Sequence, residues 1–170
     1  LLNKPLTKKQ EQVFTEADRN ANNPVLWFGE SQMSGDKILL LSDTHSYIDN
    51  QILKFVKQAD EVWHAGDIGA IAVADTLQKE TPLRAVYGNI DDAKARAEYP
   101  EHNRFMCEDV DVWITHIGGY PPRYNNRVRE KLKQNPPRLF ICGHSHILKV
   151  MPDKKLNVLH MNPGAVGIHG

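Results

Sequence analysis

The stretch from Lys37 to His45, which reads Lys-Ile-Leu-Leu-Leu-Ser-Asp-Thr-His, constrains the fold most. Consecutive aliphatic residues bounded by polar ones predict a buried strand in a sheet that is covered on both faces. Because successive side chains of an extended segment alternate sides, we expect Asp43 and His45 to point the same way and to be able to grip one cation. Taken alone, however, Asp before Thr is more typical of a turn or a helix cap.

Strand-like and helix-like segments alternate from Ile38 onward, which is the pattern of an α/β sheet. Apolar runs predict strands over 38–41, 61–65, 83–87, 104–106, 110–115, 139–142, 147–151 and 156–161. Apolar residues at helical spacing, and one charged segment, predict helices over 50–58, 70–79 and 127–133. Two hairpins are expected, around Glu108-Asp109 and around Asp153-Lys154.

Residues 1–36 differ in character from the rest of the chain, so we expect an N-terminal extension of a helix and a loop before a domain over residues 37–170. Thr7-Lys8-Lys9-Gln10 resembles a capping box and predicts a polar helix to about Asp18. Val25-Leu26-Trp27-Phe28 is an apolar cluster that could dock on the main domain or on another copy of the chain, giving a homo-oligomer. A surface extension without chemistry is the simpler interpretation of this region.

Length and composition exclude several classes of protein. A chain of 170 residues can bury one sizeable core, so a single main domain is expected. Its 21 basic and 21 acidic residues argue against a dedicated nucleic-acid coat. No apolar run reaches the ~20 residues that span a bilayer, and no signal-peptide core is present, so we expect a cytoplasmic protein with no membrane partner. Cys107 and Cys142 are too few for a disulfide framework.

Polar residues follow five of the predicted strands at the point where each strand ends. They are Asp43 and His45, Asp67, Asn89, His116, and His144 and His146. In open α/β sheets, ligands bind at the carboxyl ends of the strands. Each signal alone has a structural alternative: a turn at Gly66-Asp67 or Gly88-Asn89, a core histidine at 116, or a loop at Gly143-His144.

Together, and in this order, these motifs resemble the calcineurin-like metallophosphoesterase family, whose series is D-x-H, G-D, G-N-H-E/D, a lone His after a strand, and G-H-x-H. The resemblance covers Lys37 to about Gly164. The Leu-Ser-Asp-Thr-His start and the third motif without His resemble the small YfcE-like phosphodiesterases and the related retromer scaffold subunit. The resemblance implies an α/β fold, a four-layer αββα sandwich with two metal ions above the strand ends.

The resemblance also implies the residues that bind each metal. It places Asp43, His45, Asp67 and His146 on the first ion, and Asp67, Asn89, His116 and His144 on the second. Asp67 would bridge both ions, and the loop after Gly143 would have to turn His144 and His146 apart. Carboxylate with imidazole suits Mn²⁺, our first expectation, with Fe, Zn²⁺, Ni²⁺ and Co²⁺ as alternatives. Asp67 and Asn89 are the expected catalytic residues. Asp67 would bridge the two ions, and the Asn89 amide could also donate to a phosphate oxygen.

The function that the resemblance implies is a metal-dependent phosphodiesterase that hydrolyses a small phosphoester through a metal-bound hydroxide. Ile90 stands where the fuller family pattern has His, and it cannot protonate a leaving group. We therefore expect good hydrolysis only of activated esters such as aryl phosphodiesters, unless Tyr120, Tyr124 or another nearby group supplies the proton. Asp91 keeps its carboxylate, but its role is open.

A second departure lies at Thr115-His116-Ile117-Gly118-Gly119, where relatives usually have T-H-G-H. Residues 118–122 resemble a rim loop, and Arg123 or Arg127 could bind a substrate phosphate. Ordinary surface arginines are the simpler interpretation of both side chains.

Other functions stay open at this level. A metal-binding scaffold or protein-interaction module resembling the retromer subunit is the main alternative; the complete ligand set favours the enzyme, and Ile90 favours the scaffold. A nuclease, a phosphoprotein phosphatase or a nucleotide hydrolase could use the same metal core. The zero formal charge and the short chain weigh against a nuclease, and Ile90 weighs against a phosphoprotein phosphatase.

Overall fold

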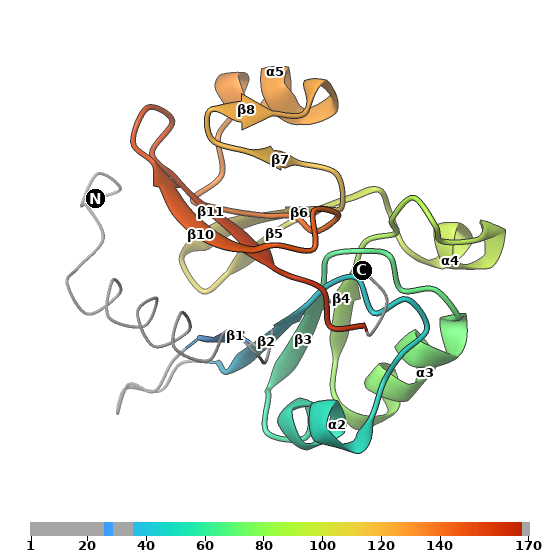
Figure 1. Ribbon diagram of the computed structural model, residues 1–170. Coiled ribbons are helices and arrows are strands. Elements are labelled where there is room, and N and C mark those ends of the chain that lie inside the picture. The colour runs from blue at the N-terminus through green and yellow to red at the C-terminus, as the bar shows by residue number, and fades with distance from the viewer. Residues whose placement is uncertain (1–25, 29–35, 168–170) are drawn as a thin grey trace.

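The computed structural model describes residues 26–28 and 36–167 of the chain, and Figure 1 shows its arrangement. The elements are β1 (Leu26–Phe28), β2 (Ile38–Leu41), α2 (Asn50–Val56), β3 (Glu61–His64), α3 (Ile71–Glu80), β4 (Leu83–Ala85), α4 (Ala93–Glu98), β5 (His102–Cys107), β6 (Val110–Thr115), β7 (Gly119–Tyr120), β8 (Arg123–Tyr124), α5 (Asn126–Gln134), β9 (Leu139–Ile141), β10 (Leu148–Asp153) and β11 (Val158–Pro163). The expected helix over 7–18 lies outside the described residues.

The first sheet has the strand order β1-β2-β3-β4 and carries α2 and α3 on one face. β2, β3 and β4 run parallel, and β1 adds antiparallel to β2. The predicted buried strand is confirmed, because all residues of β2 are buried. Leu39 and Leu41 pack toward the helices against residues such as Val56 and Leu77, while Ile38 and Leu40 face the opposite side. Because successive side chains of a strand point to opposite faces, β2 packs against apolar residues on both of its faces.

The second sheet has the strand order β10-β11-β9-β6-β5. β9 runs parallel to both β6 and β11, and the hairpins β5-β6 and β10-β11 complete the sheet. Val128 and Leu132 of α5 pack on Trp113 and Phe140, which cover the outer face of this sheet. The short β7-β8 hairpin lies beside α5 above it.

The inner faces of the two sheets pack together and form the central core. Leu40 and Trp63 of the first sheet share one buried cluster with Ile114, Ile141 and Met161 of the second. Because α2 and α3 cover the outer face of the first sheet and α5 covers that of the second, the described residues form the layers helix, sheet, sheet and helix (Figure 1). The predicted α/β class and αββα sandwich are confirmed.

Most predicted elements lie within a few residues of the observed ones, but three features differ. The six-residue helix α4 was not predicted, because its sequence lacks an apolar stripe and depends on the cap that Asp92 forms with the N–H groups of Lys94 and Ala95. The expected rim loop over 118–122 contains the hairpin strand β7. Of the apolar cluster Val25–Phe28, which we expected to dock on the main domain or on another copy, Leu26–Phe28 form an edge strand of the first sheet, and Val25 lies outside the described residues. The boundary of an independent domain at residue 37 stays a prediction.

Several strands point their carboxyl ends at one edge of the sandwich. β2, β3 and β4 are mutually parallel, and so are β6 and β9, so the loops after these strands gather at that edge. These are the loops that carry the Asp, Asn and His residues of the sequence motifs. Among the described helices, none has the length and apolar character needed to cross a bilayer.

Candidate metal centre

The backbone after β2 brings Asp43 and His45 together by turning rather than by extending. We expected an extended segment through His45, and this was wrong: the strand ends at Leu41, and Asp43 and His45 have φ values of 53° and 47°. The reason lies in the neighbouring loop. The N–H of Asp43 donates to Gly66 O at 2.9 Å, and that of His45 to Asp67 O at 3.1 Å. Two tight loops therefore hold each other in the left-handed conformation.

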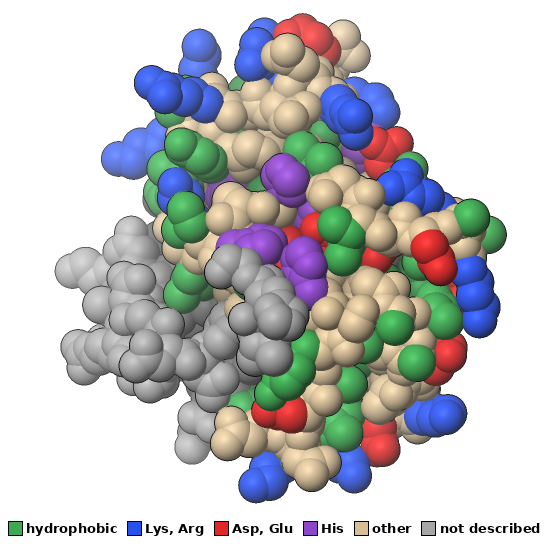
Figure 2. Space-filling model, turned by 45° about the vertical axis from the view of Figure 1, so that its right-hand side comes forward, with side chains coloured by type: hydrophobic (Ala, Val, Ile, Leu, Met, Phe, Trp, Pro, Cys, Tyr) green, Lys and Arg blue, Asp and Glu red, His purple; other side chains and the backbone are tan. Residues whose placement is uncertain are grey.

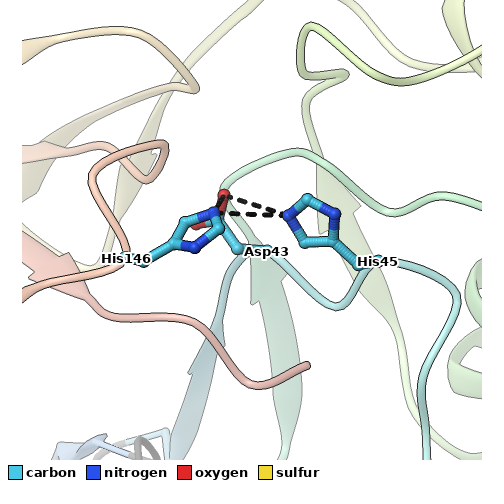
Figure 3. A group of neighbouring side chains, drawn as sticks. All are labelled: Asp43, His45 and His146. Atoms are coloured by element: carbon cyan, nitrogen blue, oxygen red, sulfur yellow. Dashed lines mark hydrogen bonds and ion pairs between the residues drawn. The ribbon is translucent and has the colours of Figure 1, made fainter. Parts of the chain in front are cut away.

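The first ligand group contains Asp43, His45 and His146 (Figure 3). His146 Nε2 lies 3.2 Å from Asp43 Oδ1 and 3.3 Å from His45 Nε2. His45 Nε2 lies 4.0 Å from the same Asp43 oxygen. The three donor atoms thus converge on one point, with the Asp43 carboxylate buried beneath two partly exposed imidazoles. Nitrogen and carboxylate oxygen together are ligands that transition-metal ions accept.

The second ligand group contains Asp67, His116 and His144. His116 Nδ1 lies 2.8 Å from the Ala65 carbonyl, which can only accept, so Nδ1 carries the hydrogen. His116 Nε2 then faces Asp67 Oδ1 at 3.2 Å and Asn89 Oδ1 at 3.1 Å. Acceptor atoms directed at a histidine lone pair are what a bound cation requires, and a backbone carbonyl on the other ring nitrogen is the usual way to orient a metal-binding imidazole.

Asp67 lies between the two groups and presents a different oxygen to each. Its Oδ1 faces His116, while its Oδ2 lies 3.8 Å from His45 Nε2. The N–H of Ile90 donates to Oδ1 at 3.1 Å, which fixes the carboxylate. The loop after Gly143 turns His144 and His146 apart, with φ values of 68° and 57°, so that each belongs to a different group.

Proton equilibria at this pair also fit a cation. Burial alone would lower the pKa of His116, but the hydrogen bond and charge of Asp67 outweigh it and raise that pKa. Burial alone would raise the pKa of Asp67, yet the hydrogen bond and charge of His116 lower it. Asp67 thus favours positive charge at His116, on the ring nitrogen where a cation would bind. The donor set fits two divalent ions.

The carboxylate of Asp43 is held by a second layer of groups. Its Oδ2 accepts the Ser42 hydroxyl at 2.6 Å and the backbone N–H of His144 at 3.1 Å. A side chain at Gly143 would collide with Ser42 and Asp43, so glycine is required there by close approach. Asn162 Nδ2 donates to the Gly143 carbonyl at 2.7 Å, which fixes the start of the loop.

His64 lies under the centre, and the sequence motifs did not identify it. It is fully buried, and its Nδ1 accepts the N–H of Gly66 at 3.1 Å. Its Nε2 therefore carries the hydrogen and faces Thr44 Oγ1 at 3.0 Å, and that hydroxyl donates to Ile68 O. Burial, helped by the charge of His116, lowers the pKa of His64 to about 3, so it is neutral. The available signal was a histidine within a buried strand, just before Gly66-Asp67.

Asp91, whose role was open, joins two loops. Its Oδ1 accepts the N–H of Gly69 at 2.8 Å, and its Oδ2 accepts that of Gly88 at 2.7 Å. A side chain at Gly88 would collide with Asp67. Arg96, which was also missed, donates to the carbonyls of Gly88, Asn89 and Asp91 and so holds the loop from behind. Ile90 itself is 47% exposed.

The remaining predicted side chains lie in different surroundings. Tyr124 is buried and donates to Asp153 Oδ2 at 2.9 Å; burial, followed by that contact, raises its pKa, so it is unsuited to donate a proton at neutral pH. Arg127 lies 3.7 Å from Glu101, and Arg123 is exposed on β8. Tyr120 is 39% exposed.

The surface view shows how these histidines are placed. Figure 2 shows histidine side chains grouped in the middle of one face, with acidic atoms between them and most lysines and arginines farther out. The carboxylates of Asp43 and Asp67 are buried, whereas His45 and His146 are partly exposed and His144 is exposed.

Comparisons with known proteins agree with this geometry. Residues 37–170 match the calcineurin-like phosphoesterase superfamily domain. A probable metallophosphoesterase from Methanothermobacter thermautotrophicus is 26% identical over 133 residues, which are 74% of this chain and 74% of that protein.

Solved structures share the fold. Vacuolar Protein Sorting 29 from Cryptosporidium parvum superposes with a TM-score of 0.64 and 18% identity, covering 78% of this chain and 76% of that one. A novel archaeal phosphodiesterase superposes with a TM-score of 0.63 and 21% identity, covering 78% and 86%.

Proposed function

Because the chain belongs to the calcineurin-like phosphoesterase superfamily over residues 37–170, we propose that it is a phosphodiesterase that works with two divalent metal ions. The observation that supports this most is the position of Asp67, whose two oxygens face His45 and His116 in different ligand groups. A carboxylate shared in this way suits a pair of cations. The probable metallophosphoesterase relative and the archaeal phosphodiesterase that shares the fold support the same class of reaction.

In this proposal each ligand group would hold one of the two metal ions. Asp43, His45 and His146 would hold one ion, and His116, His144 and Asn89 the other, with Asp67 between them. A pair of divalent ions supplies an activated water and neutralises charge on the phosphoryl oxygens. Asn89 is exposed, so its amide is accessible to a phosphate oxygen that approaches the centre.

The chain's own residues favour a diester with a good leaving group. Ile90 follows Asn89 and has no proton to donate to a leaving group. The Tyr124 hydroxyl already donates its hydrogen to Asp153. Loss of a general acid costs about 10² to 10⁴ in rate for poor leaving groups and little for nitrophenolate, which needs no proton. Aryl phosphodiesters are therefore the expected test substrates.

A second candidate function is a metal-binding scaffold with weak catalysis. Exposed apolar side chains near the centre favour it, since Ile90 is 47% and Ile147 59% exposed. Side chains of this kind can contact a protein partner. A structural neighbour named for vacuolar protein sorting is compatible with this alternative.

Turnover separates the two candidates. The protein is stripped with a chelator, reloaded with Mn²⁺, and assayed with bis(p-nitrophenyl) phosphate and with p-nitrophenyl phosphate. We expect metal-dependent hydrolysis that favours the diester, a fall of about 10² to 10³ in kcat for Asn89→Ala, and a larger fall for Asp67→Asn. Asp75→Asn, on the exposed side of α3, is the matched control and should act like the wild type. Parallel reloading with Zn²⁺, Fe²⁺, Ni²⁺ and Co²⁺ tests the metal.

A scaffold gives the opposite result. It would bind metal, but with each of these ions the wild type would hydrolyse the substrate no faster than Asp67→Asn does. If Asp67→Asn hydrolysed the substrate as fast as the wild type, the proposed metal centre would not be the site of the reaction.

A further inference from the structure

A pocket adjoins the candidate metal centre and shares one residue with it. The pocket has a volume of about 370 Å³, including its open mouth, and His144 of the second ligand group is part of its wall. Tyr120 from β7 and Lys149 from β10 form other parts of the wall. A substrate whose phosphorus lies at the metal centre can therefore extend a substituent toward this pocket.

Lys149 is a cation without an acidic partner. Its Nζ lies 3.6 Å from the centre of the Tyr120 ring, and no carboxylate of the described residues lies within ion-pair distance of it. The side chain is half-buried. The ring face stabilises and orients the charge but does not neutralise it. Such an ammonium retains its affinity for an anion.

Ser145 supplies a hydrogen-bond donor at the same pocket. Its Oγ accepts the Asn162 Nδ2–H at 3.0 Å, and Asn162 Oδ1 in turn accepts the N–H of Gly164 at 2.9 Å. The serine oxygen is thus occupied as an acceptor, which leaves its own hydrogen to point at an incoming acceptor. A hydroxyl hydrogen and an ammonium on one pocket wall match the oxygens of a phosphate group.

The base of the pocket is fixed by buried contacts. His160 is 1% exposed, and its Nε2–H donates to the Gly119 carbonyl at 2.8 Å. The Cys142 thiol lies 3.3 Å from the same carbonyl. These contacts tie β7, and with it Tyr120, to the second sheet. His160 Nδ1, which is buried, has no hydrogen-bond partner among the described residues.

We propose that this pocket is a subsite for a second phosphate group of the substrate, bound by Lys149 and Ser145. Resting on the proposed function, this narrows the substrate class to phosphodiesters in which one ester substituent carries a further phosphate. Tyr120 acts as a positioning residue, because it touches the Lys149 ammonium and would not itself contact the phosphate.

Binding tests the subsite without turnover. The Mn²⁺-loaded protein is titrated calorimetrically with alkylphosphonates and with the corresponding α,ω-diphosphonates of two to four carbons. We expect at least one diphosphonate to bind about tenfold more tightly than its monophosphonate. Lys149→Met should remove most of this preference, Tyr120→Leu should reduce it, and Tyr120→Phe, which keeps the ring, should leave it unchanged. Lys155→Met, an exposed lysine beyond the end of β10, is the matched control.

A preference that is equal in the wild type and in Lys149→Met would overturn the subsite, because the metal ions alone would then account for it. So would the absence of any preference in the wild type. Kinetics with p-nitrophenyl ethyl phosphate and its 2-phosphoethyl analogue separates this failure from failure of the proposed function. Turnover of both esters with no effect of Lys149→Met rejects the subsite alone, whereas no turnover of either rejects the phosphodiesterase and leaves the titration to decide the subsite.

Discussion

The Nε2 atom of His64 lies 3.0 Å from the Thr44 hydroxyl, and this contact joins the loop that carries Asp43 to the loop that carries Asp67. Both side chains are fully buried, and the chain of hydrogen bonds continues to the Ile68 carbonyl. Neither side chain is part of a ligand group. Together with the backbone hydrogen bonds between the same loops, their contact holds the loop of Asp43 against the loop of Asp67.

Replacing His64 should therefore weaken metal binding without removing a ligand. For His64→Ala we expect a loss of about 10- to 100-fold in Mn²⁺ affinity, the range found when groups behind metal ligands are removed. His64→Gln, which can still accept from Gly66 and donate to Thr44, should recover part of the loss. Calorimetric titration with Mn²⁺ measures both variants. Unchanged affinity in His64→Ala would show that the loops hold their positions without this histidine.

Acid should destabilise the metal-free protein through its buried neutral histidines. Burial lowers the pKa of His64 to about 3 and that of His160 to about 4, below the ordinary 6.5. Below pH 6.5 the unfolded chain binds protons at these histidines and the folded protein does not. The free energy of unfolding is therefore unaffected by them above pH 6.5 and falls as the pH falls from 6.5 toward 4. Each such histidine contributes a slope of about 1.4 kcal/mol per pH unit in this window.

Urea unfolding at pH 7, 6 and 5 in the presence of a chelator measures the slope. His64→Gln should lower the slope by up to the contribution of one proton, about 1.4 kcal/mol per pH unit, relative to the wild type. An identical slope in the variant would mean that His64 is already charged in the folded protein.

Asp91 should act on stability rather than on metal ligation. Asp91→Ala leaves the buried N–H of Gly88 and the partly buried N–H of Gly69 without their acceptor, and an unsatisfied buried group costs about 1 to 3 kcal/mol. Asp91→Asn keeps one acceptor and should cost roughly half as much. Equilibrium unfolding in urea, with Mn²⁺ absent, gives both values. Equal effects of Ala and Asn would indicate that only one of the two contacts contributes.

Ile90→His should extend the range of esters that the protein hydrolyses. The position is 47% exposed and follows Asn89, so an imidazole there can reach a leaving group at the centre. We expect a rise of about tenfold or more in kcat for an alkyl phosphodiester and little change for bis(p-nitrophenyl) phosphate. Ile90→Gln, similar in size but without a titrating proton, is the control. A rise of equal size for both esters, or in Ile90→Gln, would contradict a role as general acid.

The sequence predicted the sheets, and the gathering of Asp and His side chains at one edge, for a simple physical reason. Apolar runs such as Ile38–Leu41 fix buried parallel strands, and parallel strands bring their carboxyl ends to one edge. The residues after five strands therefore had to lie close together once the strand assignment was right. The αββα architecture was confirmed in the same way, although it was implied by family resemblance rather than by periodicity.

The features that the sequence did not predict depend on contacts between distant loops. The left-handed backbone of Asp43 and His45 results from hydrogen bonds to the Gly66–Asp67 loop, which no local pattern records. The roles of His64 and Asp91 likewise depend on which backbone N–H groups lie opposite them in space. The pocket beside His144 requires β7 and β10 to be neighbours, and the assignment of 118–122 as a loop did not anticipate this.

Metal counting combined with electron paramagnetic resonance tests the shared role of Asp67 most directly. Calorimetric titration of the metal-free protein with Mn²⁺ should give two ions per chain, and the loaded protein should show the spectrum of an exchange-coupled Mn²⁺ pair. Asp67→Asn should bind at most one ion tightly and show only an isolated Mn²⁺ signal, because both ligand groups lose the carboxylate between them. One uncoupled ion in the wild type, or a coupled pair that survives Asp67→Asn, would contradict a centre built around this carboxylate.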